Sequence, residues 1–554
     1  MSNFLIIALM NSIIKLFLFF AISMLWSCGS DMKYPEGKTV FRYNESAGIS
    51  SLDPAFARDQ ANIWADNQLY NGLVQLDENL HIKACIAKTW YISDSGRNYS
   101  FVIRDDVFFH NDAVFEDSIG RRLIASDVVY SLKRVLDIKT LSPGAVWLKN
   151  IIAIDSNNEF QIIAINDTTL SIELKEAFSP FLGRLSMPYF SVIPHEAIER
   201  YGSDFGRHPV GTGPFYLKLW KEGVKLVLLK NDRYFEKENG ASLPYLDAVA
   251  ISFIIDKQSV FLEFVKGNID FMSGIDPSYK DELLLADGSL NPKYSNQINL
   301  QSTPYLNTEY LAFQMETEKD TILLDRRIRK ALNYGFDRKK MMRYLRNNIG
   351  VAGNNGFVPI GMPGFENGET RGFFYSPDST LKLLSDAGYP EGKGLPIITL
   401  STTSAYLDIC KYIQQELGKL GVEIEIDVHQ PAALRQMIAN NRLSFFRGSW
   451  IADYADPENY LALFYTPNHS PAGANYTHFS MPEFDGLYEA ARSEVNDSIR
   501  YDLNLKMDSL IMSQAPIIIL YYDQVLRFSS KKIHNFGINS MNLLSLKNVK
   551  KDIP

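Results

Sequence analysis

Residues 449–460 read SWIADYADPENY and place three carboxylates among aromatic side chains, at Asp453, Asp456 and Glu458. Carboxylates can coordinate a metal ion, act as general acid and base, or accept charge-assisted hydrogen bonds from an ammonium group. Asp456 stands directly before Pro457, a pairing that favours a turn. The stretch therefore predicts a metal site, a pair of catalytic acids, a receptor for a cationic ligand, or a turn.

The elements that must position this stretch are predicted to alternate between strand and helix. Apolar residues recur at strand or helix spacing in successive segments. The expected strands are Leu395–Ser401, Val422–Val428 and Leu443–Ser449, and the expected helices are Ser404–Gly421 and one opened by Pro431. A β-α-β-α-β order builds a parallel sheet with right-handed crossovers. Ligands of open α/β sheets gather beyond the carboxyl ends of strands, so we expect residues 449–460 to line a cleft.

Local patterns elsewhere predict further elements. Alternating aromatic and polar residues around Ser95-Gly96 indicate a β-hairpin. Ser126 is expected to cap a helix whose apolar residues fall on one face. Residues 325–345 predict a helix, a break near Gly335, and a second helix capped by Asp337.

Length and charge narrow the class of protein. The chain has 554 residues, which predicts two to four domains because one core does not grow to that size. Its formal net charge is −8 and it carries no basic cluster, so nucleic acid is not an expected partner.

The N-terminal residues resemble a secretion signal. An apolar run after Lys15 ends in LWSC, which is similar to the bacterial lipobox in which the cysteine is acylated. We expect residues 1–27 to be a lipoprotein signal peptide and Cys28 to carry the lipid, with Met10 as an alternative start and an uncleaved membrane helix as the alternative reading. The other cysteines, Cys85 and Cys410, are predicted to be free buried thiols.

The sequence carries none of the common motifs for catalysis or metal binding. Eight histidines occur, but none belongs to an HExxH pair or to a close cluster, so no zinc site is expected. There is no GxSxG elbow, and DYADPE lacks the glycine and the spacing of a calcium loop. We therefore expect no catalytic residue, no metal and no cofactor.

Seven segments, in register from about Val40 to Val549, resemble the bacterial extracellular solute-binding proteins of family 5, which include oligopeptide- and dipeptide-binding lipoproteins of ABC transporters. The segments are SLDPAF, IAKTWYISDSGRNYSFVIRDDVFFHND, SDVVYSLKR, PVGTGPFYL, VKGNIDF, RIRKALNYGFDR and WIADYADPENY. The resemblance implies an α/β fold: a two-lobed periplasmic-binding-protein clamshell of type 2, cluster C, with an extra domain inserted in the first lobe.

The same resemblance implies the domain boundaries. Lobe I is expected at residues 28–80, 196–304 and 526–554, the inserted domain at 81–195, and lobe II, the ligand-binding α/β lobe, at 305–525. The two hinge crossings are placed near Asn299–Tyr305 and Tyr521–Arg527.

The resemblance also assigns roles in the cleft. In peptide-binding members the aspartate of the W-x-A-D-Y segment receives the α-ammonium of the peptide, and Asp453 stands at that position. A buried carboxylate left without its ammonium partner is costly, so such a site discriminates for cations. The backbone of Trp450, Ile451 and Ala452 would pair with the ligand like an added strand, with Tyr454 completing the segment.

Other binding residues are implied at the same level. Arg447 is expected to meet the α-carboxylate of the ligand, because a guanidinium offers a planar fork of donors; a structural ion pair is the alternative, and Arg371 is a rival partner. From the first lobe, Arg58 and Gln60 are expected to flank the cleft, and Trp147 to act as an aromatic lid.

These expectations combine into a monomeric, lipid-anchored receptor on the periplasmic side of the cell envelope. It would capture short peptides by lobe closure and deliver them to an ABC permease in the inner membrane, without performing chemistry. A binder of another solute, such as a nickel chelate, haem or an oligosaccharide, is the alternative within the class. A secreted hydrolase using Asp453 with Asp456 or Glu458 is the alternative from another class, and a receptor feeding a sensor is a third.

Overall fold

The computed structural model describes residues 37–368 and 370–553. Residues 40–552 form one compact unit, and the features below belong to it. The predicted signal peptide and Cys28 lie outside the described residues. In the part of the chain that is described, no helix combines the length and the apolar character needed to cross a membrane.

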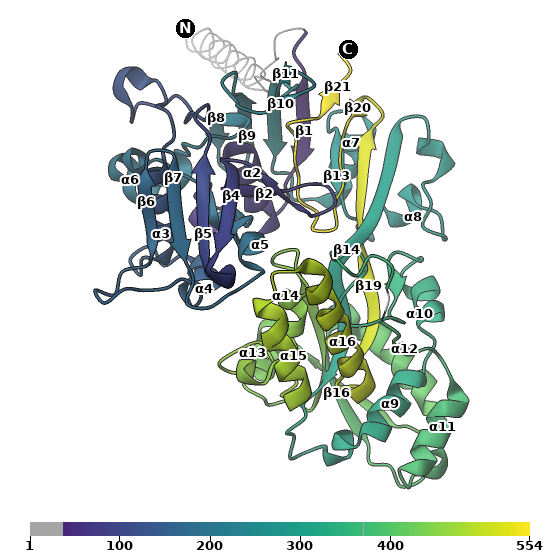
Figure 1. Ribbon diagram of the computed structural model, residues 1–554. Helices are drawn as coiled ribbons and strands as arrows, with labels where there is room; N and C mark the ends of the chain where they lie inside the picture. The colour runs from purple at the N-terminus through teal and green to yellow at the C-terminus, as the bar shows by residue number, and fades with distance from the viewer. Residues whose placement is uncertain (1–36, 369, 554) are drawn as a thin grey trace, which may run out of the picture. The chain divides into compact units, whose positions relative to one another are not determined.

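An eleven-stranded sheet forms the framework of this unit (Figure 1). Its strand order is β17-β16-β18-β14-β19-β13-β1-β12-β9-β8, with β15 paired to β19. The strands are β1 Val40–Asn44, β8 Phe215–Lys221, β9 Lys225–Lys230, β12 Ala248–Ser252, β13 Phe271–Ser273, β14 Ile298–Phe313, β15 Val351–Ala352, β16 Ile398–Thr403, β17 Ile424–His429, β18 Phe445–Ile451 and β19 Ile517–Ser530. Strands from the middle of the chain thus share one sheet with strands from both ends of the described chain.

The predicted β-α-β-α-β unit is confirmed. β16 runs parallel to β17 and to β18, with α12 Leu407–Gly418 and α13 Pro431–Ala439 as the connecting helices. Buried residues of α12, such as Ile413 and Leu417, share an apolar core with Ile398 and Leu400 of β16. The acid-rich stretch follows β18 at its carboxyl end, as expected.

Two long strands link the two halves of the sheet. β14 and β19 lie side by side and antiparallel, from Ile298 opposite Ser530 to Ala312 opposite Ile517 (Figure 1). Their register shifts between Pro304 and Thr308, where extra β14 residues interrupt the ladder. The predicted hinge segments lie within these two strands and include this irregularity; that they bend stays a prediction.

A separate four-stranded sheet lies inside residues 81–195, the segment predicted as an inserted domain. It has the order β4-β5-β7-β6, built from β4 Ala87–Ser93, β5 Asn98–Ile103, β6 Ile162–Asn166 and β7 Thr169–Glu173. The predicted hairpin is confirmed, because Ser93 pairs with Asn98 across the turn. Phe101 and Leu170 of this sheet belong to the same apolar core as Phe41 of β1.

Two helical predictions have different outcomes. The helix α3 Ala125–Leu136 exists, but Ser126 is not its cap: Ile124 occupies that position, and its backbone N–H donates to the Asp127 carboxylate at 2.9 Å. Asp127 lies in the first turn of the helix, where a carboxylate accepts hydrogen bonds from N–H groups that have no partner within the helix and interacts favourably with the helix dipole. The helix pair α9 Arg326–Tyr334 and α10 Arg338–Leu345, with Asp337 as N-cap, is confirmed.

The remaining elements surround these sheets. The other helices are α2 Gln60–Leu69, α4 Val146–Lys149, α5 Phe181–Leu185, α6 His195–Tyr201, α7 Lys257–Val265, α8 Lys280–Leu283, α11 Pro377–Asp386, α14 Glu458–Leu461, α15 Pro482–Ser493 and α16 Asp497–Gln514. Three two-stranded pairs join β2 Val74–Leu76 to β3 Ile82–Ala84, β10 Lys237–Glu238 to β11 Ala241–Ser242, and β20 Ile533–His534 to β21 Lys550–Lys551. Cys85 and Cys410 are free and buried, as predicted.

Candidate ligand-binding site

Residues 452–458, here called the acid loop, leave the sheet at the end of β18. The last residue of β18, Ile451, pairs with Asn307 of β14. The loop is then held by two bonds to one carbonyl: the Ala452 backbone N–H and the Tyr460 hydroxyl donate to the Leu306 oxygen at 2.9 and 2.7 Å. The irregular part of β14 therefore fixes the place where the acid loop begins.

Asp453 is the exposed acid of this loop. Its carboxylate accepts a hydrogen bond from the Asn459 side chain at 3.3 Å, and its own N–H donates to the Asn459 oxygen. The Trp450 indole N–H donates to the same oxygen at 2.9 Å. Loss of water around the carboxylate raises the pKa of Asp453, while the Asn459 bond and the charge of Arg184 oppose that rise. The group is thus oriented by an amide rather than neutralised by a salt bridge.

Asp456 points into the protein and has its own cation. Its carboxylate pairs with Arg500 of α16 at 2.6 Å, and both side chains are buried. The other carboxylate oxygen accepts the Glu458 backbone N–H at 2.9 Å. The prediction that Asp456 shapes a turn is therefore confirmed, with an ion pair added.

Glu458 is the most completely engaged of the three acids. It accepts hydrogen bonds from the Tyr454 hydroxyl, from the Tyr488 hydroxyl at 2.5 Å, and from Arg184 at 3.3 Å. Burial alone would raise its pKa, but the Arg184 charge and the two hydroxyl donors hold the pKa of Glu458 below its usual value. Asp456 and Glu458 are therefore held by structural partners, and neither offers a carboxylate to a substrate beside Asp453.

Arg184 of α5 is a site residue that the sequence did not reveal. Its guanidinium donates to the Trp147 carbonyl at 2.9 Å and to the Tyr454 hydroxyl at 3.1 Å. The rings of Trp147 and Tyr454 meet edge to face at 5.7 Å. Two predicted site residues are thus brought together, and the arginine that joins them is an isolated cation in the sequence FLGRLS, with no motif to mark it.

Tyr189 is a second residue that the sequence missed. Burial raises its pKa to about 12, with the charge of Asp453 adding to the rise and that of Arg58 opposing it. Asp453 and Arg58, which are both predicted site residues, therefore lie near the Tyr189 hydroxyl. Arg58 is exposed and stands 3.9 Å from Asp59, and the neighbouring Gln60 is exposed as the first residue of α2.

The two candidate carboxylate partners have different surroundings. Arg447 of β18 pairs with Glu309 of β14, with the side chains 13% and 4% exposed, and its guanidinium lies 3.4 Å above the Tyr406 ring. Its charge is thus already matched inside the protein. Arg371 is exposed, and its backbone forms an isolated antiparallel β-bridge with that of Asn355. Its side chain makes no ion pair with any described residue.

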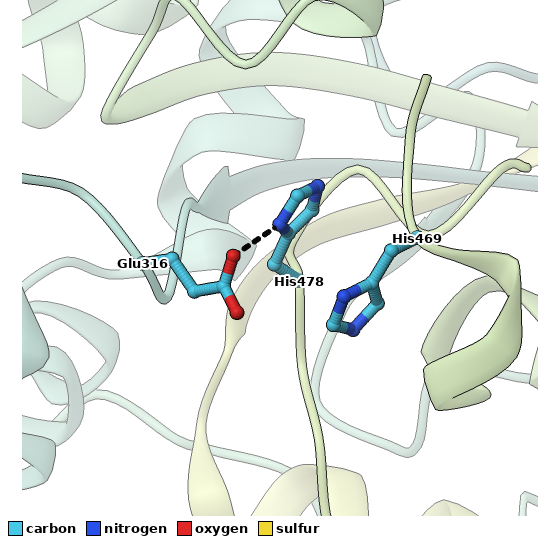
Figure 2. A group of neighbouring side chains, drawn as sticks. All are labelled: Glu316, His469 and His478. Atoms are coloured by element: carbon cyan, nitrogen blue, oxygen red, sulfur yellow. Dashed lines mark hydrogen bonds and ion pairs between the residues drawn. The ribbon is translucent and has the colours of Figure 1, made fainter. Parts of the chain in front are cut away.

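The expectation that no histidines cluster is wrong in three dimensions. His469 and His478 stack with ring centroids 4.4 Å apart, and His478 bonds Glu316 (Figure 2). The two histidines are nine positions apart on a loop that folds back on itself, so spacing motifs do not detect the pair.

Comparison with known proteins supports one family. The family model of bacterial extracellular solute-binding proteins, family 5, matches residues 81–472. The oligopeptide-binding protein OppA of Bacillus subtilis is 27% identical over 519 residues, covering 90% of each chain. The dipeptide-binding protein of Escherichia coli K12 is 23% identical over 501 residues, covering 87% of this chain and 88% of the relative.

Solved structures show the same fold. HbpA2 from Haemophilus parasuis matches with a TM-score of 0.80 at 20% identity, covering 93% of this chain and all 100% of its own. DppA from Helicobacter pylori, solved with the peptide STSA, matches with a TM-score of 0.71 at 24% identity, covering 93% and 98%. The α/β fold is that of the two-lobed periplasmic binding proteins, as predicted, and these are binding proteins rather than enzymes. The chain belongs to the bacterial extracellular solute-binding proteins of family 5.

Proposed function

We propose that this protein is the substrate-binding protein of an ABC importer, that it captures short peptides, and that Asp453 receives their α-ammonium group. One observation carries the proposal. Of the three carboxylates in the acid loop, Asp456 and Glu458 are paired with arginines, whereas Asp453 is exposed and forms no salt bridge with a described residue. A ligand ammonium would supply the missing cation through charge-assisted hydrogen bonds.

The surroundings of Asp453 favour a peptide among the possible amines. Trp450 and Ile451 end a strand, and Ile451 is 49% exposed. An extended ligand backbone could continue the ladder beside these residues, as in recognition by strand addition. The names of the relatives support the same ligand class, since they are an oligopeptide-binding and a dipeptide-binding protein.

Anchoring and delivery extend the proposal. The LWSC sequence at residues 25–28 supports export of the receptor to the periplasmic side of the envelope, where the acylated Cys28 anchors it to a membrane. Delivery to an inner-membrane permease follows from the role of solute-binding proteins in import.

Calorimetric titration tests the ammonium role. The mature chain carrying Cys28→Ser, stripped of copurified ligand, is titrated with pooled di- to pentapeptides and with the same peptides N-acetylated. We expect binding of the free amines and a loss of roughly 10- to 100-fold in affinity for the acetylated peptides and for Asp453→Asn, because a hydrogen bond to a charged group is worth about 1.5–3 kcal/mol. Asp502→Asn, which removes an exposed carboxylate on α16, should bind like the wild type.

Two outcomes would contradict the proposal. Equal binding of free and acetylated peptides would remove Asp453 from the ammonium role while leaving a peptide receptor. Absence of binding by every peptide would reject the peptide reading itself, and nickel chelates, haem and oligosaccharides would be titrated next.

A further inference from the structure

The cluster of Glu316, His469 and His478 lies beyond the end of β14, whereas the acid loop begins beside the middle of that strand. β14 pairs with β18 from Asn307 opposite Ile451 to Phe313 opposite Phe445. Those seven residues of strand are six steps of about 3.3 Å and span about 20 Å. Glu316 follows just after Phe313, so the cluster is a separate place on the same sheet, independent of the proposed peptide site.

Three potential metal ligands converge here. One atom each from Glu316, His469 and His478 lies within 4.8 Å of the other two. A Glu316 carboxylate oxygen is 2.6 Å from Nδ1 of His478, and the two imidazole planes are inclined by only 12° (Figure 2). Glu316 is exposed, with 61% of its side chain in contact with solvent, whereas only 9% of the His478 side chain is exposed.

The hydrogen bonds of the two rings select which nitrogens face the cluster. Nε2 of His469 is 3.1 Å from the Phe479 carbonyl, and Nε2 of His478 is 2.9 Å from the Ser470 carbonyl. A carbonyl only accepts, so Nε2 carries a proton in both rings, and Nδ1 is the nitrogen left for a metal ion. The 2.6 Å contact between Nδ1 of His478 and the Glu316 carboxylate also needs a proton on that nitrogen, and a metal ion that binds there displaces it. Metal-binding histidines are oriented in this way, with the second nitrogen donating to a backbone carbonyl.

The loop that carries the histidines is held by its own side chains. Asn475 is fully buried, and its amide donates to the Tyr465 carbonyl at 3.2 Å and to the Phe479 carbonyl at 2.9 Å. Asn441 donates to the Ser470 carbonyl at 3.0 Å. The carbonyls of Phe479 and Ser470 therefore each accept a hydrogen bond from an asparagine and from a histidine. These bonds hold the backbone of the loop and the two imidazole rings in place.

The carboxylate side is fixed as well. The Met315 N–H donates to the Thr477 carbonyl at 2.7 Å, which ties the segment after β14 to the histidine loop. Glu316 is the next residue, so its carboxylate reaches His478 from a segment that is bonded directly to the loop.

We propose that Glu316, His469 and His478 form a binding site for a divalent transition-metal ion of the Zn²⁺ class. Two imidazoles and one carboxylate are ligands that suit Zn²⁺, and three protein ligands leave a fourth position for water. The ion replaces the contact between Glu316 and Nδ1 of His478, and binds through Nδ1 of both rings. Ligands around Zn²⁺ stand about 3.4 Å apart when bond lengths are about 2.1 Å, so the rings turn out of their stack and the carboxylate draws inward.

Titration of the EDTA-treated mature chain, Cys28→Ser, with ZnCl₂ tests the site. We expect one ion per chain, and at least a tenfold weaker affinity in Glu316→Gln and in His469→Ala. His81→Ala, which removes a histidine 60% exposed elsewhere, should bind Zn²⁺ like the wild type. Because His478 is buried, its replacement risks unfolding the loop, so the variants of the exposed Glu316 and the half-buried His469 carry the test instead.

Absorption of bound Co²⁺ gives a second readout. A site with two imidazole ligands should give a visible d–d spectrum in the wild type that is lost in His469→Ala, with circular dichroism unchanged. Equal Zn²⁺ affinity in the wild type, Glu316→Gln and His469→Ala would overturn the proposal, as would the absence of Zn²⁺ binding by the wild type. Both results are independent of whether the chain binds peptides.

Discussion

Arg184 and Glu458 are 274 positions apart in the sequence, and their side chains meet at 3.3 Å with only 12% and 9% of their surfaces exposed. Arg184 belongs to α5, which follows the four-stranded sheet, and Glu458 ends the acid loop. Tyr454 touches both, since it donates to Glu458 and accepts from Arg184. The pair therefore ties the loop that presents Asp453 to a distant segment of the chain.

Replacement of Arg184 should destabilise the protein strongly. Arg184→Met leaves Glu458 buried without its cation, a change that costs about 3–5 kcal/mol. The folded state depresses the pKa of Glu458, so the stabilisation from this group is present at neutral pH and is lost as pH falls through the folded pKa. Urea unfolding should therefore show a large difference between wild type and variant at pH 7 and a smaller one in acid.

A rescue experiment separates the ion pair from simple loss of packing. Arg184→Met combined with Glu458→Gln should recover much of the lost free energy of unfolding, because no buried charge remains. Arg435→Met, which removes an exposed arginine of α13, should leave stability unchanged. If the double variant is as unstable as Arg184→Met, the charge of Glu458 is not the cause.

The pair of Arg447 and Glu309 can be tested for a role in ligand binding. Arg447→Met should destabilise the protein because it leaves Glu309, 4% exposed, without a cation, and adding Glu309→Gln should restore stability. Peptides and their C-terminal amides are then titrated into the stable double variant. In each protein, the affinity for the amidated peptide is compared with the affinity for the free peptide. If amidation weakens binding equally in the wild type and in the double variant, Arg447 does not contact the ligand carboxylate.

Asp508 of α16 should make the protein less stable as pH rises. Burial raises the pKa of Asp508 to about 6, although the Phe357 N–H donates to it at 2.7 Å. Because the folded state holds this proton more tightly than the unfolded state, its stabilisation is complete below pH 4 and is lost as pH rises through 6. The loss amounts to about 3 kcal/mol, from roughly two pKa units. Asp508→Asn should flatten this part of the stability profile, whereas the exposed Asp502→Asn should not.

The two thiols should react only when the protein unfolds. Burial raises the pKa of Cys85 to about 12 and also raises that of Cys410, so neither forms the reactive thiolate at pH 8. The native mature chain with Cys28→Ser should give no colour with a disulfide reagent, and the denatured chain should give two equivalents. Rapid reaction of one thiol under native conditions, assigned with Cys85→Ser, would show that its site opens.

Local patterns identified the elements best where one segment carries its own signal. In residues 395–449 the spacing of the apolar residues alternates between that of a strand and that of a helix. The order of these elements alone implies a parallel sheet, so the position of Asp453 after β18 could be predicted. The cap of α10 is likewise a local feature, because Asp337 stands directly before the helix that it caps. Ser126 shows the limit of such rules, since the helix already begins at Ala125 and Ser126 therefore lies inside its first turn rather than at its cap.

Contacts between distant segments could not be predicted in this way. The meeting of Arg184 with Glu458 depends on how α5 packs against the acid loop, which no spacing encodes. Glu316 and His478 meet because the segment after β14 bonds to a loop more than 150 residues later, at 2.6 Å between carboxylate and imidazole. One short segment allows two alternative roles for Arg447, and the partner that distinguishes them, Glu309, lies on another strand.

The position of β19 has a consequence for biogenesis. This strand is made almost last, yet it lies between β14 and β13 rather than at an edge of the sheet. A nascent chain that ends before Ile517 lacks the strand that joins the two halves, and pairing of Ile298 with Ser530 must wait for nearly the whole polypeptide. Such long-range closure makes folding slow. Until β19 is made, β14 and β13 lack the strand that lies between them, so a truncated chain keeps open strand edges in the middle of its sheet.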